Sequence, residues 1–416
     1  MSKLSTYPMS RVLSAQRAVF VIFALNGFHF ANFAARVPTV RDGLGLTPQQ
    51  MGLLLLVGSV GSLVALPLSG LVVQRLGAAT TVRAFAVVNV VGLLLAGAMV
   101  AAGLPVLVAL SFFVFCVGTS VWDSAMNLEG TVVERHRGAT IMPKLHAGFS
   151  LGTVAGAGTG ALAAWAQLPL LVHLLIVLVP SLVTVLLATR GFLPAEGTGD
   201  VAADETEARA ARRGRVGRAA RAWTEPRTLL LGLVVLAAAI TEGSANDWMA
   251  LAVVDGFEVD NAVGAVFFGV FVAAMTLGRF AGGALLDRFG RVVVLRVSAG
   301  LAILGLALFA IPSSILFAAI GAILWGLGAA VGFPVGISAA ADDPLHAATR
   351  VPVVATIGYS AFLVGPPVLG FLADKVGYRT ALLAIIVPAV VSLLVAAVAR
   401  PLAASAPEQA ADSLEA

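Results

Sequence analysis

Polar side chains recur at helical spacing inside a long apolar segment near the start of the chain. Asn26, His29 and Asn32 follow one another every third residue, and Arg36 lies four residues further on. At 100° per residue these side chains occupy roughly 120° of one helical face. This polar face suits the wall of a cavity that binds a polar solute. A network of hydrogen bonds between helices would give the same pattern.

A second apolar segment carries a carboxyl group. Glu242 and Asn246 lie one helical turn apart on one face, and Glu242 follows His29 by 213 positions. The next residue, Asp247, points elsewhere on the helical wheel, and we expect it near the outer mouth. A carboxyl at bilayer depth is costly when charged, so its protonation can become coupled to conformation. We therefore expect Glu242 to carry protons, with a structural ion pair or a polar anchor as the alternatives.

Another group of titratable residues lies around positions 123–146. Asp123 and Asn127 share a face with Glu134 at the end of one apolar run, and His146 begins the next run. Asp123 and His146 are candidates for a second protonatable site or an inner gate. The alternative is a charge network that fastens the loop between the two runs.

The segment that begins with His146 has two different faces. Ser150 and Thr153 lie on the same side as His146, and we expect this side to face the cavity. The other side has a glycine at every fourth position, which permits close approach of another helix backbone. These glycines are Gly148, Gly152, Gly156 and Gly160.

Two stretches lying 213 positions apart end apolar segments in the same way. One reads Gly70-Leu-Val-Val-Gln-Arg-Leu-Gly77 and the other Gly283-Ala-Leu-Leu-Asp-Arg-Phe-Gly290. A second echo pairs Gly148-Phe-Ser150 with Gly358-Tyr-Ser360, at a spacing of 210. Such repeats are typical of a duplicated membrane domain with a central binding site, which also makes Tyr359 a candidate contact for the solute.

Charged residues in and around the second of these stretches could act as a conformational latch. Asp287 could pair with arginines at helix ends in one state and separate from them in another. Arg279, two turns before Asp287, should extend outward to join this network. The predicted gating residues are Arg279, Gly283, Asp287, Arg288, Gly290 and Arg291.

The elements that hold these residues must be membrane-spanning helices. Hydrophobic residues make up 59% of the chain and charged residues only 12%, about half of the charged fraction usual in soluble domains. Continuous apolar runs of about 20 residues match helices that cross the bilayer, rather than the alternating strands of a barrel. We predict an all-α membrane protein with twelve spans in two pseudo-symmetric bundles of six. The spans are 17–38, 51–73, 83–103, 104–128, 143–167, 169–190, 228–251, 261–286, 292–311, 313–338, 351–373 and 380–399.

Charge distribution divides and orients the chain. The predicted parts are an N-terminal bundle (1–190), a cytoplasmic linker (191–227), a C-terminal bundle (228–400) and a cytoplasmic tail (401–416). The linker is rich in arginine and is either a plain solvated tether or partly a basic helix on anionic lipid. Basic residues are concentrated in alternate loops, which places both termini in the cytoplasm. Residues 283–291 would then lie in a cytoplasmic loop, between the eighth and ninth spans.

In these features the chain resembles the major facilitator superfamily. Residues 283–291 match the superfamily's loop motif G-x-x-x-D-R-x-G-R, whereas Gln74 replaces the acidic residue in the first copy. The stretches Asn26 to Pro38, Leu44 to Gly52, Asp123 to Asn127 and Met142 to Ser150 are similar to a bacterial branch related to fucose-permease-type sugar transporters. The resemblance implies two helix bundles that alternate access to one site, with a sugar-like solute.

The resulting expectation is a secondary active transporter, not an enzyme, in the bacterial inner membrane. It would move a small polar solute with protons, and the alternative is a proton-driven exporter of drugs or metabolites. We expect a monomer whose partners are solute, protons and membrane lipids, without nucleic acid, metal or cofactor. No nucleotide-binding Gly-Lys-Ser/Thr loop is present in the sequence. The predicted substrate contacts are Asn26, His29, Asn32, Asn127, Ser150, Glu242, Asn246 and Tyr359, and the predicted proton-coupling residues are Glu242, Asp123 and His146.

Overall fold

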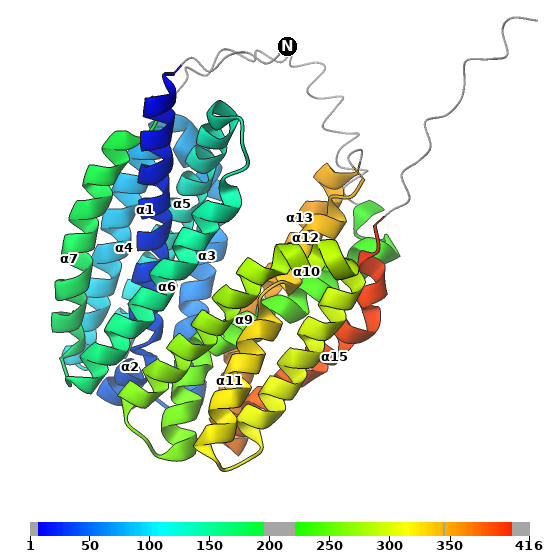
Figure 1. Ribbon diagram of the computed structural model, residues 1–416. Coiled ribbons are helices and arrows are strands. Elements are labelled where there is room, and N and C mark those ends of the chain that lie inside the picture. The colour runs from blue at the N-terminus through cyan, green and yellow to red at the C-terminus, as the bar shows by residue number, and fades with distance from the viewer. Residues whose placement is uncertain (1–6, 195–220, 344–345, 402–416) are drawn as a thin grey trace, which may run out of the picture.

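The computed structural model describes residues 7–194, 221–343 and 346–401 of the chain, and all its regular elements there are helices (Figure 1). The first half contains α1 (Met9–Ala34), α2 (Val37–Leu44), α3 (Pro48–Leu76), α4 (Ala78–Ala101), α5 (Pro105–Arg137), α6 (Met142–Trp165), α7 (Leu170–Ala188) and η1 (Thr189–Gly191). The second half contains α9 (Pro226–Phe257), α10 (Asn261–Ala310), α11 (Ile315–Ala329), α12 (Gly332–Ala340), α13 (Ala347–Val376), α14 (Tyr378–Leu382), η2 (Leu383–Ile385), α15 (Ile386–Val395) and η3 (Ala396–Ala399).

The lengths of the described helices are consistent with twelve membrane crossings. Ten helical segments among the described residues are long and apolar enough to span a bilayer. One of these, α10, contains Gly290 in a non-helical conformation (φ 75°, ψ 162°), which divides it into two spans. The 24-residue α6 is the remaining crossing, since its glycines and polar residues lower its hydropathy but not its length. The predicted all-α membrane fold is confirmed.

The helices form two bundles, α1–α7 and α9–α15, which lie side by side (Figure 1). The bundles meet at the end where α2 lies and diverge toward the end where α1 begins. We call the first of these the closed end. The predicted linker lies outside the described residues except for 191–194 and 221–227, as does the predicted tail except for residue 401.

Glycines and an ion pair hold the closed end together. A Cβ on Gly52 of α3 would lie 2.6 Å from the carbonyl oxygen of Pro366 and 3.2 Å from the Cα of Gly370, both in α13. Only residues without a side chain allow the two backbones to come this close. Beside them, Arg41 Nη1 lies 2.5 Å from Asp255 Oδ2, so the contact also carries a salt bridge between the bundles.

Local signals explain where several helices begin and end. Thr47 and Gln50 form a reciprocal capping box at the start of α3, with Pro48 in the first turn. Gly138, at φ 66°, ends α5 nine residues later than the predicted limit of 128. The reason is that α5 continues as a helix beyond its apolar part.

One span is interrupted, and another contains prolines without being interrupted. The run Gly365-Pro366-Pro367 lies inside α13, which continues through it as one helix. The tenth span is interrupted instead, because Ala330 and Val331 separate α11 from α12.

The glycine face of α6 packs on α1, as the sequence indicated. Added Cβ atoms on this face would overlap the backbone of α1: one on Gly152 would meet the carbonyl oxygen of Ala24, and one on Gly156 would meet that of Phe28. This close packing fixes the position of His146 at the start of α6.

Candidate functional site

A bidentate ion pair lies within the C-terminal bundle. Arg279 Nη2, on α10, lies 2.9 Å and 2.8 Å from the two carboxylate oxygens of Glu242 on α9. The side chains are 26% and 32% exposed for Glu242 and Arg279 respectively, so both remain accessible, although Glu242 lies at the middle of α9 and Arg279 lies within the first part of α10. Arg279 Nε also donates to the carbonyl oxygen of Ala330 at 3.4 Å, at the interruption between α11 and α12. One guanidinium therefore connects three helices of this bundle.

This arrangement corrects the role predicted for Arg279. The side chain does not extend toward Asp287 but is occupied by Glu242. The physical reason is that two charge-assisted hydrogen bonds are available within the bundle, whereas Asp287 lies two turns away. The sequence also left open whether Glu242 is part of an ion pair, and in this conformation it is.

The N-terminal bundle places other titratable side chains opposite this pair. Asp123 and Asn127 lie half-buried on α5, and His146 is exposed at the start of α6. The charge of Arg279 acts on His146, and the charge of Asp123 acts on Tyr359 of α13. These predicted residues therefore lie within electrostatic range of each other, although they come from different bundles.

Tyr359 belongs to a row of three aromatic rings. Its ring centroid lies 5.8 Å from that of Phe333 and 6.3 Å from that of Phe362. All three residues are half-buried. Phe362 also packs on Gly243, where a Cβ would lie 3.1 Å from its ring, and Gly243 follows Glu242 directly. The row thus runs beside the ion pair.

His29 does not line the space between the bundles, so this predicted substrate contact is wrong in this conformation. The residue is fully buried inside the N-terminal bundle. Its Nδ1 lies 2.7 Å from Asn89 Oδ1 on α4 and its Nε2 lies 2.5 Å from Ser181 Oγ on α7. Trp122 packs edge-on against the same ring at 5.3 Å. His29 therefore joins four helices of one bundle.

Asn32 and Ser150 were also predicted to contact the substrate, and this prediction is wrong in this conformation for the same reason, because both side chains are buried. Asn32 is fully buried; its side-chain oxygen accepts a hydrogen bond from Thr159 and lies 2.9 Å from His173 Nε2. Ser150 is only 5% exposed, and Thr153 beside it is 4% exposed, so the polar side of α6 is packed rather than open except at His146. The polar face of the first span therefore forms a hydrogen-bond network between helices, which is the alternative that the sequence allowed.

The other predicted substrate contacts on α1 and α9, and the neighbouring Asp247, differ in how far they are buried. Asn26 is only 2% exposed, so this predicted substrate contact is also packed rather than open in this conformation, and its side-chain nitrogen has no hydrogen-bond partner among the described residues. Asn246 is half-buried on α9, one turn after Glu242. Asp247, which the sequence placed near the outer mouth, is half-buried, and its charge acts on Cys116 of α5. This carboxyl therefore lies within electrostatic range of the other bundle, which the sequence did not indicate.

The predicted latch residues lie at the end opposite the closed end. Gly283, Arg288 and Gly290 are exposed, and the Arg288 guanidinium lies 5.2 Å from the centroid of the Phe289 ring. Arg291 is engaged with the loop after α12, where its Nη1 lies 2.6 Å from Asp342 Oδ1. These contacts connect the middle of α10 to α12 within one bundle.

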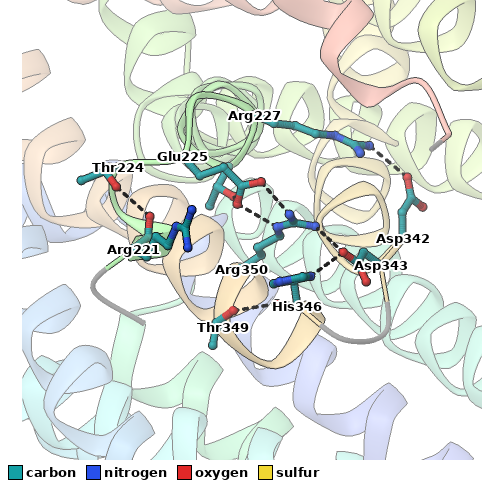
Figure 2. Close-up of polar contacts among 10 residues, drawn as sticks. Arg221, Thr224, Glu225, Arg227, Asp342, Asp343, His346, Thr349 and Arg350 are labelled. Carbon is teal, nitrogen blue, oxygen red and sulfur yellow. Dashed lines mark hydrogen bonds and ion pairs between the residues drawn. The ribbon is translucent and has the colours of Figure 1, made fainter. Parts of the chain in front are cut away.

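Further charged contacts lie around Asp342 and Asp343 (Figure 2). Arg350 of α13 forms two hydrogen bonds to the carboxylate of Glu225, at 2.8 Å and 2.6 Å, and a third to Asp343 at 3.2 Å. Arg227 lies 3.1 Å from Asp342 Oδ2. Burial opposes ionisation of Glu225, but the hydrogen bonds from Arg350 and Thr228 and the charge of Arg350 hold its pKa below the usual value. Nothing in the sequence indicated these pairings beyond the clustering of charges beside apolar spans.

Comparisons with known proteins agree with this architecture. The profile described as Major Facilitator Superfamily matches residues 19–361. The uncharacterised transporter y4wD of Sinorhizobium fredii is 31% identical over 391 residues, which covers 91% of this chain and 99% of that protein. The solved structure of the nucleoside transporter NupG has a TM-score of 0.68 at 14% identity, covering 94% of this chain and 100% of NupG. A single-residue variant of the fucose:proton symporter FucP of E. coli has a TM-score of 0.64 at 16% identity, covering 92% of this chain and 98% of FucP. The chain belongs to the major facilitator superfamily and is a multi-pass membrane transporter.

Proposed function

We propose that this chain is a secondary active transporter that moves a small polar, sugar-like solute together with protons by alternating access. The observation that carries the proposal is the accessible Glu242–Arg279 pair inside the C-terminal bundle, with Asp123 and His146 of the other bundle within electrostatic range of this bundle. The names of the structural neighbours, a nucleoside transporter and a fucose:proton symporter, support a polar solute of this size.

The proposal includes an orientation. The distribution of basic residues places both termini in the cytoplasm of a bacterium, with the protein as a monomer in the inner membrane among lipids and without nucleic acid. The closed end, held by Arg41 and Asp255, then faces outward. The end where α1 begins faces the cytoplasm, so the conformation described above is inward-facing.

Proton coupling would arise because the Glu242 carboxylate is either paired with Arg279 or protonated, but not both. In this conformation the carboxylate accepts both hydrogen bonds from Arg279. Arg279 also contacts the carbonyl oxygen of Ala330, so a shift of α11 against α12 would disturb the pair. A carboxylate that loses its arginine at this depth is costly and would take up a proton. Protonation would therefore accompany the change of conformation.

The test is to measure two kinds of transport in liposomes that contain purified protein. Sugars, nucleosides, organic acids and cationic drugs are first ranked by how much they raise the melting temperature. The best probe is then followed in equilibrium exchange and in accumulation driven by a pH gradient. Glu242→Gln should keep the exchange within about threefold and reduce the driven accumulation at least about tenfold. Asp260→Asn removes a carboxyl in a loop outside the site and serves as the matched control.

Two results would contradict the proposal. Unchanged driven accumulation in Glu242→Gln would leave Glu242 as a structural ion pair and remove it from coupling. Solute movement opposite to the direction of proton movement would make the protein an exchanger, which is the exporter function considered from the sequence.

A further inference from the structure

An apolar groove of about 500 Å³ lies on the surface of the C-terminal bundle. Both spans of α10 line it, on either side of Gly290, together with Leu327 and Val331 near the end of α11. Among its lining residues, Leu277 and Val297 are 66% and 55% exposed, so the described part of the chain leaves the groove uncovered. We call it the α10 groove. In a membrane protein, an exposed apolar surface of this kind contacts lipid or a further protein chain.

Two arginines lie beside the α10 groove. The guanidinium of Arg288 lies 5.2 Å from the centroid of the Phe289 ring, and Phe289 lines the groove. Arg296 follows Val293 by three residues and directly precedes Val297, and both valines line the groove. Residues three apart on a helix are neighbours on its surface, so Arg296 lies at the edge of the groove. Both arginines are exposed, and among the described residues neither forms an ion pair.

The position of Arg296 is costly unless an anion reaches its guanidinium. Arg296 comes six residues after Gly290, which is about 9 Å along the helix and inside the ninth span. An unpaired arginine at this depth has to extend along apolar surface toward the headgroup region. Arg291 is already paired with Asp342. Asp287 is exposed at the same corner and offsets one charge, so Arg288 and Arg296 leave an excess of one positive charge there.

We propose that the α10 groove binds an anionic phospholipid, with an acyl chain in the groove and the phosphate held by Arg288 and Arg296. The volume of the groove is in the range of small-molecule sites, and its lining suits a hydrocarbon chain. A small anion would leave the apolar groove unfilled, and a lipid without net charge would leave the excess positive charge unbalanced. In the orientation proposed above, the groove opens to the cytoplasmic leaflet, where basic side chains meet anionic headgroups. The site does not include Glu242 or the solute, so the inference goes beyond the transporter function.

Lipids that differ only in headgroup provide the test. Dioleoyl phosphatidylglycerol, phosphatidylethanolamine and phosphatidylcholine are titrated onto the purified full chain in detergent, and native mass spectrometry counts the lipids that stay bound. Phosphatidylglycerol should half-fill one site at a concentration about 25-fold lower than phosphatidylcholine, at about fivefold for each arginine. Glycerol phosphate, which has the charged group without acyl chains, should not bind at these concentrations. Equal filling by the three lipids, or equal binding of glycerol phosphate, overturns the proposal.

Variants locate the site. Arg288→Gln and Arg296→Gln should each weaken phosphatidylglycerol binding about fivefold, and Arg75→Gln, at the equivalent corner of the other bundle, is the matched control. Val297→Trp fills the groove and should weaken binding at least about fivefold, whereas Val183→Trp, at an exposed position of α7, should not. Unchanged binding in Val297→Trp, or an equal loss in Arg75→Gln, contradicts the proposal. A lipid-free dimer that Val297→Trp dissociates would make the groove a contact between two copies of the chain, which also overturns it.

Discussion

A single methyl group at the closed end should open it. In Gly52→Ala the new Cβ would lie 2.6 Å from the carbonyl oxygen of Pro366, about 0.8 Å inside ordinary van der Waals contact. Both groups belong to helix backbones of different bundles, so neither can rotate away and the bundles must separate. Overpacking of this kind costs roughly 1–3 kcal/mol. Because the opposite conformation lacks this contact, the equilibrium between the two should shift about 5- to 150-fold away from the closed end.

Electron-spin distance measurements can detect this shift. Spin labels at Leu104 and Ile311, exposed loop positions on different bundles at the closed end, report its width. The only cysteine of the chain, Cys116, is first replaced by alanine. The longer-distance population should increase in Gly52→Ala. Gly158→Ala is the control, because a Cβ at Gly158 meets nothing within 4 Å. An unchanged distance distribution in Gly52→Ala, or an equal shift in Gly158→Ala, would refute the reasoning.

Two further outcomes follow from buried and charged contacts. The pKa of Glu225 is lowered in the folded protein, so its pairing with Arg350 stabilises the fold above pH about 4.5 and this contribution is lost as the pH falls below that value. Melting temperatures from pH 7 to pH 3.5 should therefore decline less steeply in Glu225→Gln, and a parallel decline would contradict the assignment. His29→Leu leaves Asn89 and Ser181 without their partner inside the bundle and should cost about 1–3 kcal/mol. His29→Gln, which can still form hydrogen bonds, should recover part of the melting temperature, and equal losses in both variants would exclude the hydrogen bonds as the cause.

Much of the fold could be predicted because hydrophobic length and glycine spacing act locally. Apolar runs define the spans, and the fourth-residue glycines of α6 indicated close packing, which the structure shows to be against α1. The exception is the interruption at Ala330 and Val331. These two residues have nothing unusual in the sequence, whereas Pro366 and Pro367 lie inside a continuous helix.

The site could be predicted only in part, because a helical wheel does not show which neighbour a face meets. His29 and Asp123 are both polar residues in apolar spans, but His29 is fully buried in its own bundle whereas Asp123 is half-buried and acts electrostatically on Tyr359 of the other bundle. Ion pairs between residues that lie far apart in the sequence could not be predicted either. Arg41 and Asp255 are 214 positions apart, and only the assembled bundles bring them together.

Three glycines with positive φ follow one rule that relates the two halves of the molecule. Gly77, Gly290 and Gly377 end the second, eighth and eleventh spans, each seven residues after another glycine, with φ of 77°, 75° and 79° and ψ of 158°, 162° and 157°. Gln167, seven residues after Gly160, has φ 52° and lies two residues past the end of α6, so the corner after the fifth span differs. Gly377 lies at the closed end and Gly77 and Gly290 lie at the other, since successive three-helix units run in opposite directions. Both mouths of the transporter thus use the same glycine corner.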